Sequence, residues 1–178
     1  MDGLEVRAAS ADDAAAIAEV AAATFALACP PHTTPESIAS FIAEHLTAAH
    51  FAEYLADPGR ALVVAEQQGA AVGYAMLVHG DPYDADARAV VKRLPTTELS
   101  KLYVLASAHG SGVARDLMAA AIEAARAAGA AGIWLGTNQR NERAHRFYVK
   151  CGFERVGTKR FKVGAGWEDD YIFELALG

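Results

Sequence analysis

Short apolar segments alternate with helical patterns along the chain. The segments that predict strands are residues 4–8, 61–66, 71–78, 98–105, 133–136, 153–163 and 167–177. In the stretches that begin near Ser10, Thr34, Thr47, Gly112 and Asn141, apolar residues recur every three to four positions, as on one face of a helix. This order of elements predicts a mixed α/β fold.

Capping residues mark where the first helices should begin. Ser10 precedes acidic residues that complement a helix dipole, and this helix is expected to run to about Phe25. Thr34 precedes Pro35, which favours the first helical position. Residues 34–56 are therefore expected to form a helical pair, and an insertion of this kind often shapes a pocket.

One long segment resists assignment. Residues 80–97 have mixed charge and contain two X-Pro pairs, Asp81-Pro82 and Leu94-Pro95. Loops of this length inside a compact domain tend to be either functional or disordered. The sequence leaves both interpretations open.

Composition sets the broad class. The 178 residues are 53% hydrophobic and 21% charged, which is typical of one globular domain over residues 1–178. No stretch has the roughly 18 uncharged apolar residues of a membrane span, and the N-terminus lacks the pattern of a signal peptide, so a cytoplasmic location is expected.

The cysteines and the net charge limit which metals and partners the protein is expected to bind. Cys29 and Cys151 have no spacing that would hold zinc, so neither a structural disulfide nor a metal is expected. The formal charge of −6 without a basic cluster argues against nucleic acid and is compatible with a small cationic substrate.

A glycine turn provides the first candidate site. An apolar strand over 102–105 leads into a turn from His109 to Ala114, and a helix follows. Gly110 and Gly112 allow backbone N–H groups to converge, and the start of the helix adds further unsatisfied donors. The turn is therefore predicted to hold a phosphate group.

A second motif lies about thirty residues further on and makes the pattern specific. The chain resembles the GNAT superfamily of acyl-CoA-dependent N-acyltransferases. The family signature Q/R-x-x-G-x-G/A aligns with residues 109–114, with His109 in place of Gln or Arg. The later signature N-x-x-A-x-x-F-Y-x-x-x-G-F is matched without a gap by Asn141, Ala144, Phe147, Tyr148, Gly152 and Phe153.

The resemblance implies a fold and a cofactor site. The fold is a largely antiparallel sheet, splayed between its fourth and fifth strands and flanked by helices. Acetyl-CoA would act as the co-substrate, with its pyrophosphate on the glycine turn and its pantetheine arm along the preceding strand. The implied cofactor-binding residues are Leu102, Tyr103, Val104, His109, Gly110, Ser111, Gly112, Val113, Ala114, Arg115, Asn141 and Tyr148.

The resemblance also implies direct attack of an amine in a ternary complex, without a metal. Glu98 matches the position of a general base, and Tyr148 that of the general acid which protonates the leaving thiolate. The N–H near Val104 would hydrogen-bond the thioester carbonyl. From the residues alone, a tyrosine on such a helix face is usually a packing residue, and Glu98 could be a solvated charge at the start of a strand.

The resemblance gives less information about the molecule that accepts the acetyl group. Several segments look like those of PaiA-type polyamine N-acetyltransferases, which act on spermidine or spermine. Acidic residues that would attract such a polycation are Glu36, Glu44, Glu53, Asp169 and Asp170. Other small amines, a protein N-terminus and a non-catalytic acyl-CoA sensor are alternatives, and the family also includes homodimers. A P-loop is disfavoured because the turn lacks its Lys-Ser/Thr pair.

Overall fold

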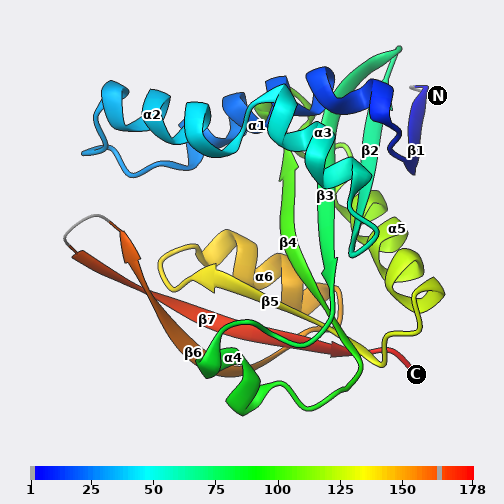
Figure 1. Cartoon of the computed structure of the whole chain (residues 1–178), viewed down its shortest axis with the longest axis vertical. Coiled ribbons are helices and arrows are strands. Elements are labelled where there is room, and N and C mark those ends of the chain that lie inside the picture. Colours follow the sequence, from blue (N-terminus) through cyan, green and yellow to red (C-terminus); the bar gives the residue numbers. More distant parts are fainter. Residues whose placement is uncertain (1–2, 164–165) are drawn as a thin grey trace. The chain divides into compact units, whose positions relative to one another are not determined.

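The computed structural model describes residues 3–163 and 166–178 (Figure 1). In these residues, seven strands form one sheet in the order β1-β2-β3-β4-β5-β7-β6. The strands are β1 (Leu4–Ala8), β2 (Arg60–Gln67), β3 (Ala70–His79), β4 (Thr96–Val104), β5 (Gly132–Asn138), β6 (Glu154–Val163) and β7 (Gly166–Ala176). The helices are α1 (Ala14–Ala28), α2 (Pro35–His45), α3 (Ala48–Ala56), α4 (Ala85–Val90), α5 (Val113–Ala127) and α6 (Glu142–Lys150).

The sheet is mixed, as predicted. β1 with β2, β5 with β7 and β6 with β7 are antiparallel, whereas β4 and β5 are parallel. In the described residues the parallel ladder joins three residues of β4, Thr96–Glu98, to Gly132–Trp134 of β5. Because these pairs lie at the start of both strands, the short ladder agrees with the predicted splay. None of the described helices is long and apolar enough to cross a membrane.

The chain consists of two compact units, and the prediction of a single domain over 1–178 stays a prediction. Unit 1 comprises residues 1–76 and 101–121. Its core lies between α1, α3 and one face of β2 and β3, and contains Ile17, Val20, Phe51, Leu62, Val64, Tyr74 and Met76. On the other face, a Cβ at Gly73 would lie 3.0 Å from Leu117 Cδ1 of α5. Glycine therefore lets α5 pack closely on this strand.

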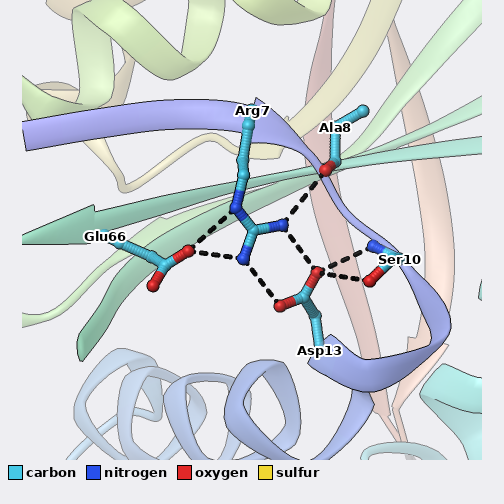
Figure 2. A network of polar contacts seen from close by, with 5 residues as sticks. All are labelled: Arg7, Ala8, Ser10, Asp13 and Glu66. Carbon is cyan, nitrogen blue, oxygen red and sulfur yellow. Dashed lines mark hydrogen bonds and ion pairs between the residues drawn. The ribbon is translucent and has the colours of Figure 1, made fainter. Parts of the chain in front are cut away.

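A polar network fixes the start of α1 in unit 1 (Figure 2). Arg7 on β1 donates hydrogen bonds to both carboxylate oxygens of Asp13, at 2.8 and 2.9 Å, and to Glu66 of β2. Asp13 in turn accepts from the N–H of Ser10 at 2.7 Å. The Arg7 guanidinium is the main cause that lowers the pKa of Asp13 to about 2. The network therefore links two strands to the capping box in front of α1.

Unit 2 comprises residues 77–100 and 122–178, and a helix covers each face of its strands. α4 packs through Ala87 and Val91 on Trp134 and Ile172, and this side is called the α4 face. Phe173, the next residue on β7, points to the opposite side because side chains alternate along a strand. There its ring contacts the rings of His145 and Tyr148 on α6, and this side is called the α6 face.

The structure settles the open segment 80–97. It contains α4, and β4 begins at Thr96, two residues before the predicted start of this strand. Asp84 caps α4 because its carboxylate accepts hydrogen bonds from the N–H groups of Asp86 and Ala87, at 2.8 and 3.1 Å. The segment is therefore largely ordered, and its helix forms part of the core of unit 2.

Candidate active site

The glycine turn of unit 1 has the predicted backbone conformation. Gly110 and Gly112 have φ angles of +81° and +85°, a region that side chains rarely adopt. α5 begins directly after the turn, at Val113. A Cβ at Gly112 would lie 3.3 Å from Nη2 of Arg115, so the guanidinium lies over the turn. Free N–H groups at a helix start and a nearby cation together form an anion site.

His109, the residue that departs from the family signature, has a structural role in the turn. Its Nε2 donates a hydrogen bond to the carbonyl oxygen of Val104, at 2.9 Å. Ser111 adds a second bond, from its hydroxyl to the carbonyl of Ala108. The imidazole therefore ties the turn back to the end of β4.

The predicted pantetheine strand forms the last part of β4. Val104 lies against Gly73 of β3, where an added Cβ would meet Val104 Cγ2 at 3.3 Å. Just beyond the strand, the N–H of Leu105 donates to the carbonyl of Val72 at 2.8 Å. The rings of Tyr103 and Tyr74 are 6.0 Å apart. Residues 102–104 are thus held by β3 immediately before the glycine turn.

Unit 1 also contains a cavity of about 100 Å³. Its lining residues are Ala21, Thr24, Phe25, Phe41, Leu46, Tyr74, Lys101 and Tyr103. Phe41 of α2 stacks on Phe25 of α1, with ring centroids 4.3 Å apart. Phe41 and Leu46 belong to the segment 34–56, which was expected to shape a pocket, and the pocket that it helps to form is mainly aromatic.

In unit 2, α6 holds the candidate acid Tyr148. Asn141 caps this helix, because its side-chain oxygen accepts from the N–H of Ala144 at 3.1 Å. The Tyr148 ring is half-buried and lies 5.9 Å from Phe153 and 6.0 Å from Phe173. The cap and the aromatic contacts fix the ring on the α6 face.

The candidate base Glu98 lies on the other side of the same strands. Glu98 is the register partner of Trp134 in the parallel ladder, so the two side chains share one face. Trp134 packs under α4, which places the half-buried Glu98 on the α4 face. The structure therefore does not place Glu98 and Tyr148 together on one surface. It places them on opposite faces of unit 2.

Of the polar residues on the face of Glu98, Asp170 was expected to attract an amine, whereas Trp134, Asp84 and Lys159 were not singled out from the sequence. Trp134 is completely buried, and its indole N–H has no hydrogen-bond partner in the described residues. Asp170, Asp84 and Lys159 lie on the same face, with Lys159 Nζ 3.9 Å from Asp170 and 4.0 Å from Asp84. Desolvation raises the pKa of Asp170, and the nearby Lys159 opposes this rise.

Two histidines and the two cysteines make local contacts or are partly buried. His79 Nδ1 lies 2.9 Å from the hydroxyl of Thr97, and His50 belongs to the capping box of α3. Cys29 and Cys151 are free thiols, and burial raises the pKa of each. In residues 3–163 and 166–178 no three His, Cys, Asp or Glu side chains gather as a metal site.

The predicted cofactor residues divide between the units. Unit 1 holds the end of β4, the glycine turn and the first turn of α5, which together carry residues 102–104 and 109–115. Unit 2 holds Glu98, Asn141 and Tyr148. Their roles stay predictions: unit 1 contributes a glycine turn with positive φ angles, and unit 2 contributes a carboxylate and a phenol.

A mixed sheet with a short parallel ladder and a glycine turn at a helix start is typical of the GNAT fold. The sequence matches the Acetyltransferase (GNAT) family over residues 22–153, and the chain belongs to this family. A relative from Mycobacterium tuberculosis, an uncharacterized N-acetyltransferase, is 49% identical over 165 residues, covering 93% of this chain and 98% of the relative. The protein is therefore an acetyltransferase that uses acetyl-CoA as its acetyl donor.

Solved structures agree on the fold. The PaiA N-acetyltransferase of Thermoplasma acidophilum, crystallised with coenzyme A, has a TM-score of 0.76 at 18% identity, with 98% of this chain and 99% of that chain covered. The acetyltransferase yncA of Salmonella typhimurium, crystallised with acetyl-CoA, has a TM-score of 0.68 at 23% identity, with 98% and 94% covered. Similarity at this level of identity concerns the architecture.

Proposed function

We propose that the protein transfers the acetyl group of acetyl-CoA to a primary amine of a small molecule, by direct attack in a ternary complex. The observation that carries this proposal is the continuity of β4. This strand holds Glu98 near its start and leads at its end into a glycine turn with an anion-binding conformation. The strand that contains the candidate base therefore leads, along the chain, into the candidate phosphate site.

The donor site would be built mainly from backbone groups. The N–H groups from Gly110 to Arg115 suit a pyrophosphate, since both glycines have positive φ and a guanidinium lies over Gly112. The peptide-like pantetheine arm would follow residues 102–104. The fold neighbours crystallised with coenzyme A or acetyl-CoA support this assignment. Asn141 would contribute through the start of α6.

The reaction needs a neutral amine. An alkylamine with a pKa of about 10.4 is neutral in fewer than about one molecule in a thousand at pH 7. Glu98 would accept the proton, directly or through water, and the amine nitrogen would then bond to the thioester carbonyl carbon. The N–H of Val104 would stabilise the negative charge that develops on the carbonyl oxygen. When the carbon–sulfur bond breaks, Tyr148 would protonate the leaving thiolate, and the extra proton on the acetylated nitrogen would pass through solvent to restore the Tyr148 hydroxyl.

In the proposed ternary complex, Glu98 and Tyr148 would act from opposite faces of unit 2. The base would meet the acceptor from the α4 face, whereas the acid would serve the thiolate from the α6 face. Two substrates can then react directly, and no enzyme nucleophile is needed. Among acceptors we favour a polyamine, which fits the formal net charge of −6 and the buried carboxylates of the α4 face.

The test is acetyl transfer to a panel of amines. The full chain would be incubated with acetyl-CoA and spermidine, 1,4-diaminobutane, n-butylamine, an aminoglycoside or a peptide with a free N-terminus. Released thiol and the mass of the product would both be measured. Thiol release with an acetylated small amine supports the proposal. Acetylation of the peptide alone would assign a protein acceptor, and stabilisation by acetyl-CoA without any transfer would indicate a sensor.

A further inference from the structure

An alkylammonium group already lies between two carboxylates on the α4 face. Lys159 Nζ is 4.0 Å from Asp84 Oδ2 and 3.9 Å from Asp170 Oδ2. The three side chains are largely buried, with exposed fractions of 11%, 20% and 12% for Lys159, Asp84 and Asp170. A Cβ at Gly136 would lie 2.7 Å from Lys159 Cε and 3.3 Å from Asp170 Oδ2. This mixed-charge cluster is therefore packed directly against β5.

Tyr83 adds an aromatic ring beside these carboxylates. Its side chain is mostly exposed, and its ring centroid is 6.5 Å from that of Trp134. Desolvation raises the pKa of the Tyr83 hydroxyl, and the negative charges of Glu98, Asp84 and Asp170 raise it further. Three carboxylates therefore act on one accessible ring. An exposed aromatic face with carboxylates around it suits an alkylammonium ion.

Trp134 gives an independent indication that this face receives a ligand. Its indole N–H is completely buried and has no hydrogen-bond partner in the described part of the chain. Trp134 is the register partner of Glu98 and contacts Tyr83, so this donor belongs to the same face. Buried polar groups in native proteins are nearly always bonded. A donor at this place suits an oxygen atom of a bound molecule or of a water that joins it to Glu98.

We propose that Tyr83, Asp84 and Asp170 bind a second ammonium group of the acceptor while its reacting nitrogen lies at Glu98. This inference rests on the proposed function and narrows the acceptor class to diamines and polyamines. The carboxylates supply opposite charge, and Tyr83 supplies a ring face. Lys159 shows that the pair of aspartates accommodates an alkylammonium group, and it would compete with the acceptor for them.

The strand register bounds the length of the acceptor. Glu98 lies opposite Trp134, whereas Asp170 lies opposite Asn138, four residues further along β5 and on its other side. A strand rises about 3.3 Å per residue, and neighbouring strands are about 4.8 Å apart. The backbones of Glu98 and Asp170 are therefore about 13 Å apart along the strand direction and about 10 Å apart across the strands. Both side chains project from the same face, and a hydrogen bond of about 3 Å at each carboxylate shortens the span between the two bound nitrogens. The site should therefore prefer spermidine to the shorter 1,4-diaminobutane.

The experiment compares spermidine with n-butylamine, which lacks a second charge. Asp170→Asn and Tyr83→Ala should each raise the KM for spermidine about tenfold or more, and change the KM for n-butylamine and acetyl-CoA less than about twofold. The matched control is Asp86→Asn, which removes an exposed carboxylate from the same helix, α4. Lys159→Met should lower the KM for spermidine, because it removes the competing ammonium.

Equal effects on spermidine and n-butylamine in Asp170→Asn and Tyr83→Ala would overturn the second ammonium site. Tyr83 is mostly exposed, so Tyr83→Ala keeps the test valid if Asp170→Asn does not fold, which circular dichroism would show. If no amine is acetylated, the proposed function fails. Calorimetric binding of spermidine to the protein with CoA then tests the site alone. Weaker binding by the variants supports it, and unchanged binding contradicts it.

Discussion

Glu98 and Trp134 are partners in the parallel ladder between β4 and β5. The candidate base therefore lies beside a completely buried indole whose N–H has no hydrogen-bond partner in the described residues. This relationship places the base on the face that α4 covers, together with Asp84 and Asp170. The α4 face is thus the side from which an acceptor amine would reach Glu98.

Replacing Tyr148 by Phe should lower kcat by about a hundredfold and leave the KM for acetyl-CoA within about twofold. The substitution removes only the hydroxyl, while the ring contacts with Phe153 and Phe173 are kept. Steady-state kinetics with a saturating amine would measure both constants. Turnover equal to that of the parent protein would remove Tyr148 as the acid.

Replacing Glu98 by Gln should lower the rate most at low pH. There the amine is almost entirely protonated, so removal of its proton depends most on the base. A profile of kcat/KM from pH 6 to pH 10 would test this, with the exposed Glu19→Gln as the control. A uniform loss at every pH would mean that another group, or solvent, takes the proton.

Replacing Gly112 by Ala should raise the KM for acetyl-CoA about tenfold with a smaller effect on kcat. A side chain at φ +85° is strained by about 1 kcal/mol, and the methyl group would displace the Arg115 guanidinium. Gly129→Ala is a matched control, since Gly129 has φ +86° with open space around its Cβ position at the end of α5. Both variants should lose similar stability, but only Gly112→Ala should weaken the donor site. An equal KM in the two variants would count against the anion site.

Replacing Asp13 by Asn should destabilise the protein in a pH-dependent way. Arg7 lowers the folded-state pKa of Asp13 from 3.8 to about 2, so its contribution to stability is present above about pH 4 and is lost as the pH falls toward 2. After allowance for solvent screening, the contribution at pH 7 is about 1 kcal/mol. Urea unfolding at pH 7 and at pH 2.5 would measure it, with the exposed Asp12→Asn as the control. A constant difference between the two pH values would exclude this linkage.

The sequence predicted the elements that have strong local signals. Thr34 and Asn141 cap α2 and α6 as expected, because a cap depends on the side chain and on N–H groups two or three residues away. The hairpin between β2 and β3 turns at Gln68 and Gly69, both with positive φ. The glycine turn before α5 was predicted for the same reason, since its conformation is local.

The features that the sequence did not predict, α4 and the arrangement of the carboxylates on the α4 face, depend on tertiary packing. α4 has only six residues, too few for a clear helical period, and it is held by Ala87 and Val91 on Trp134. The signal that could have identified it was Asp84 as an N-cap. The location of Asp84 and Asp170 on the same face as Glu98 depends on strand order and register, which a single sequence does not specify. For this reason Asp170 was expected to attract an amine, but its arrangement with Asp84 and Lys159 was not predicted.

Gly136 and Lys159 are distant in the sequence but pack against each other. The missing side chain of Gly136 allows Lys159 to pack against β5 while its Nζ lies between Asp84 and Asp170, because a Cβ there would lie 2.7 Å from Lys159 Cε. Residues 136 and 159 should therefore vary together among relatives. A relative with Ala or a larger residue at 136 should have a short side chain at 159, and it would then leave both aspartates to its substrate. Natural variation at this pair would thus tune the affinity of each enzyme for polycations.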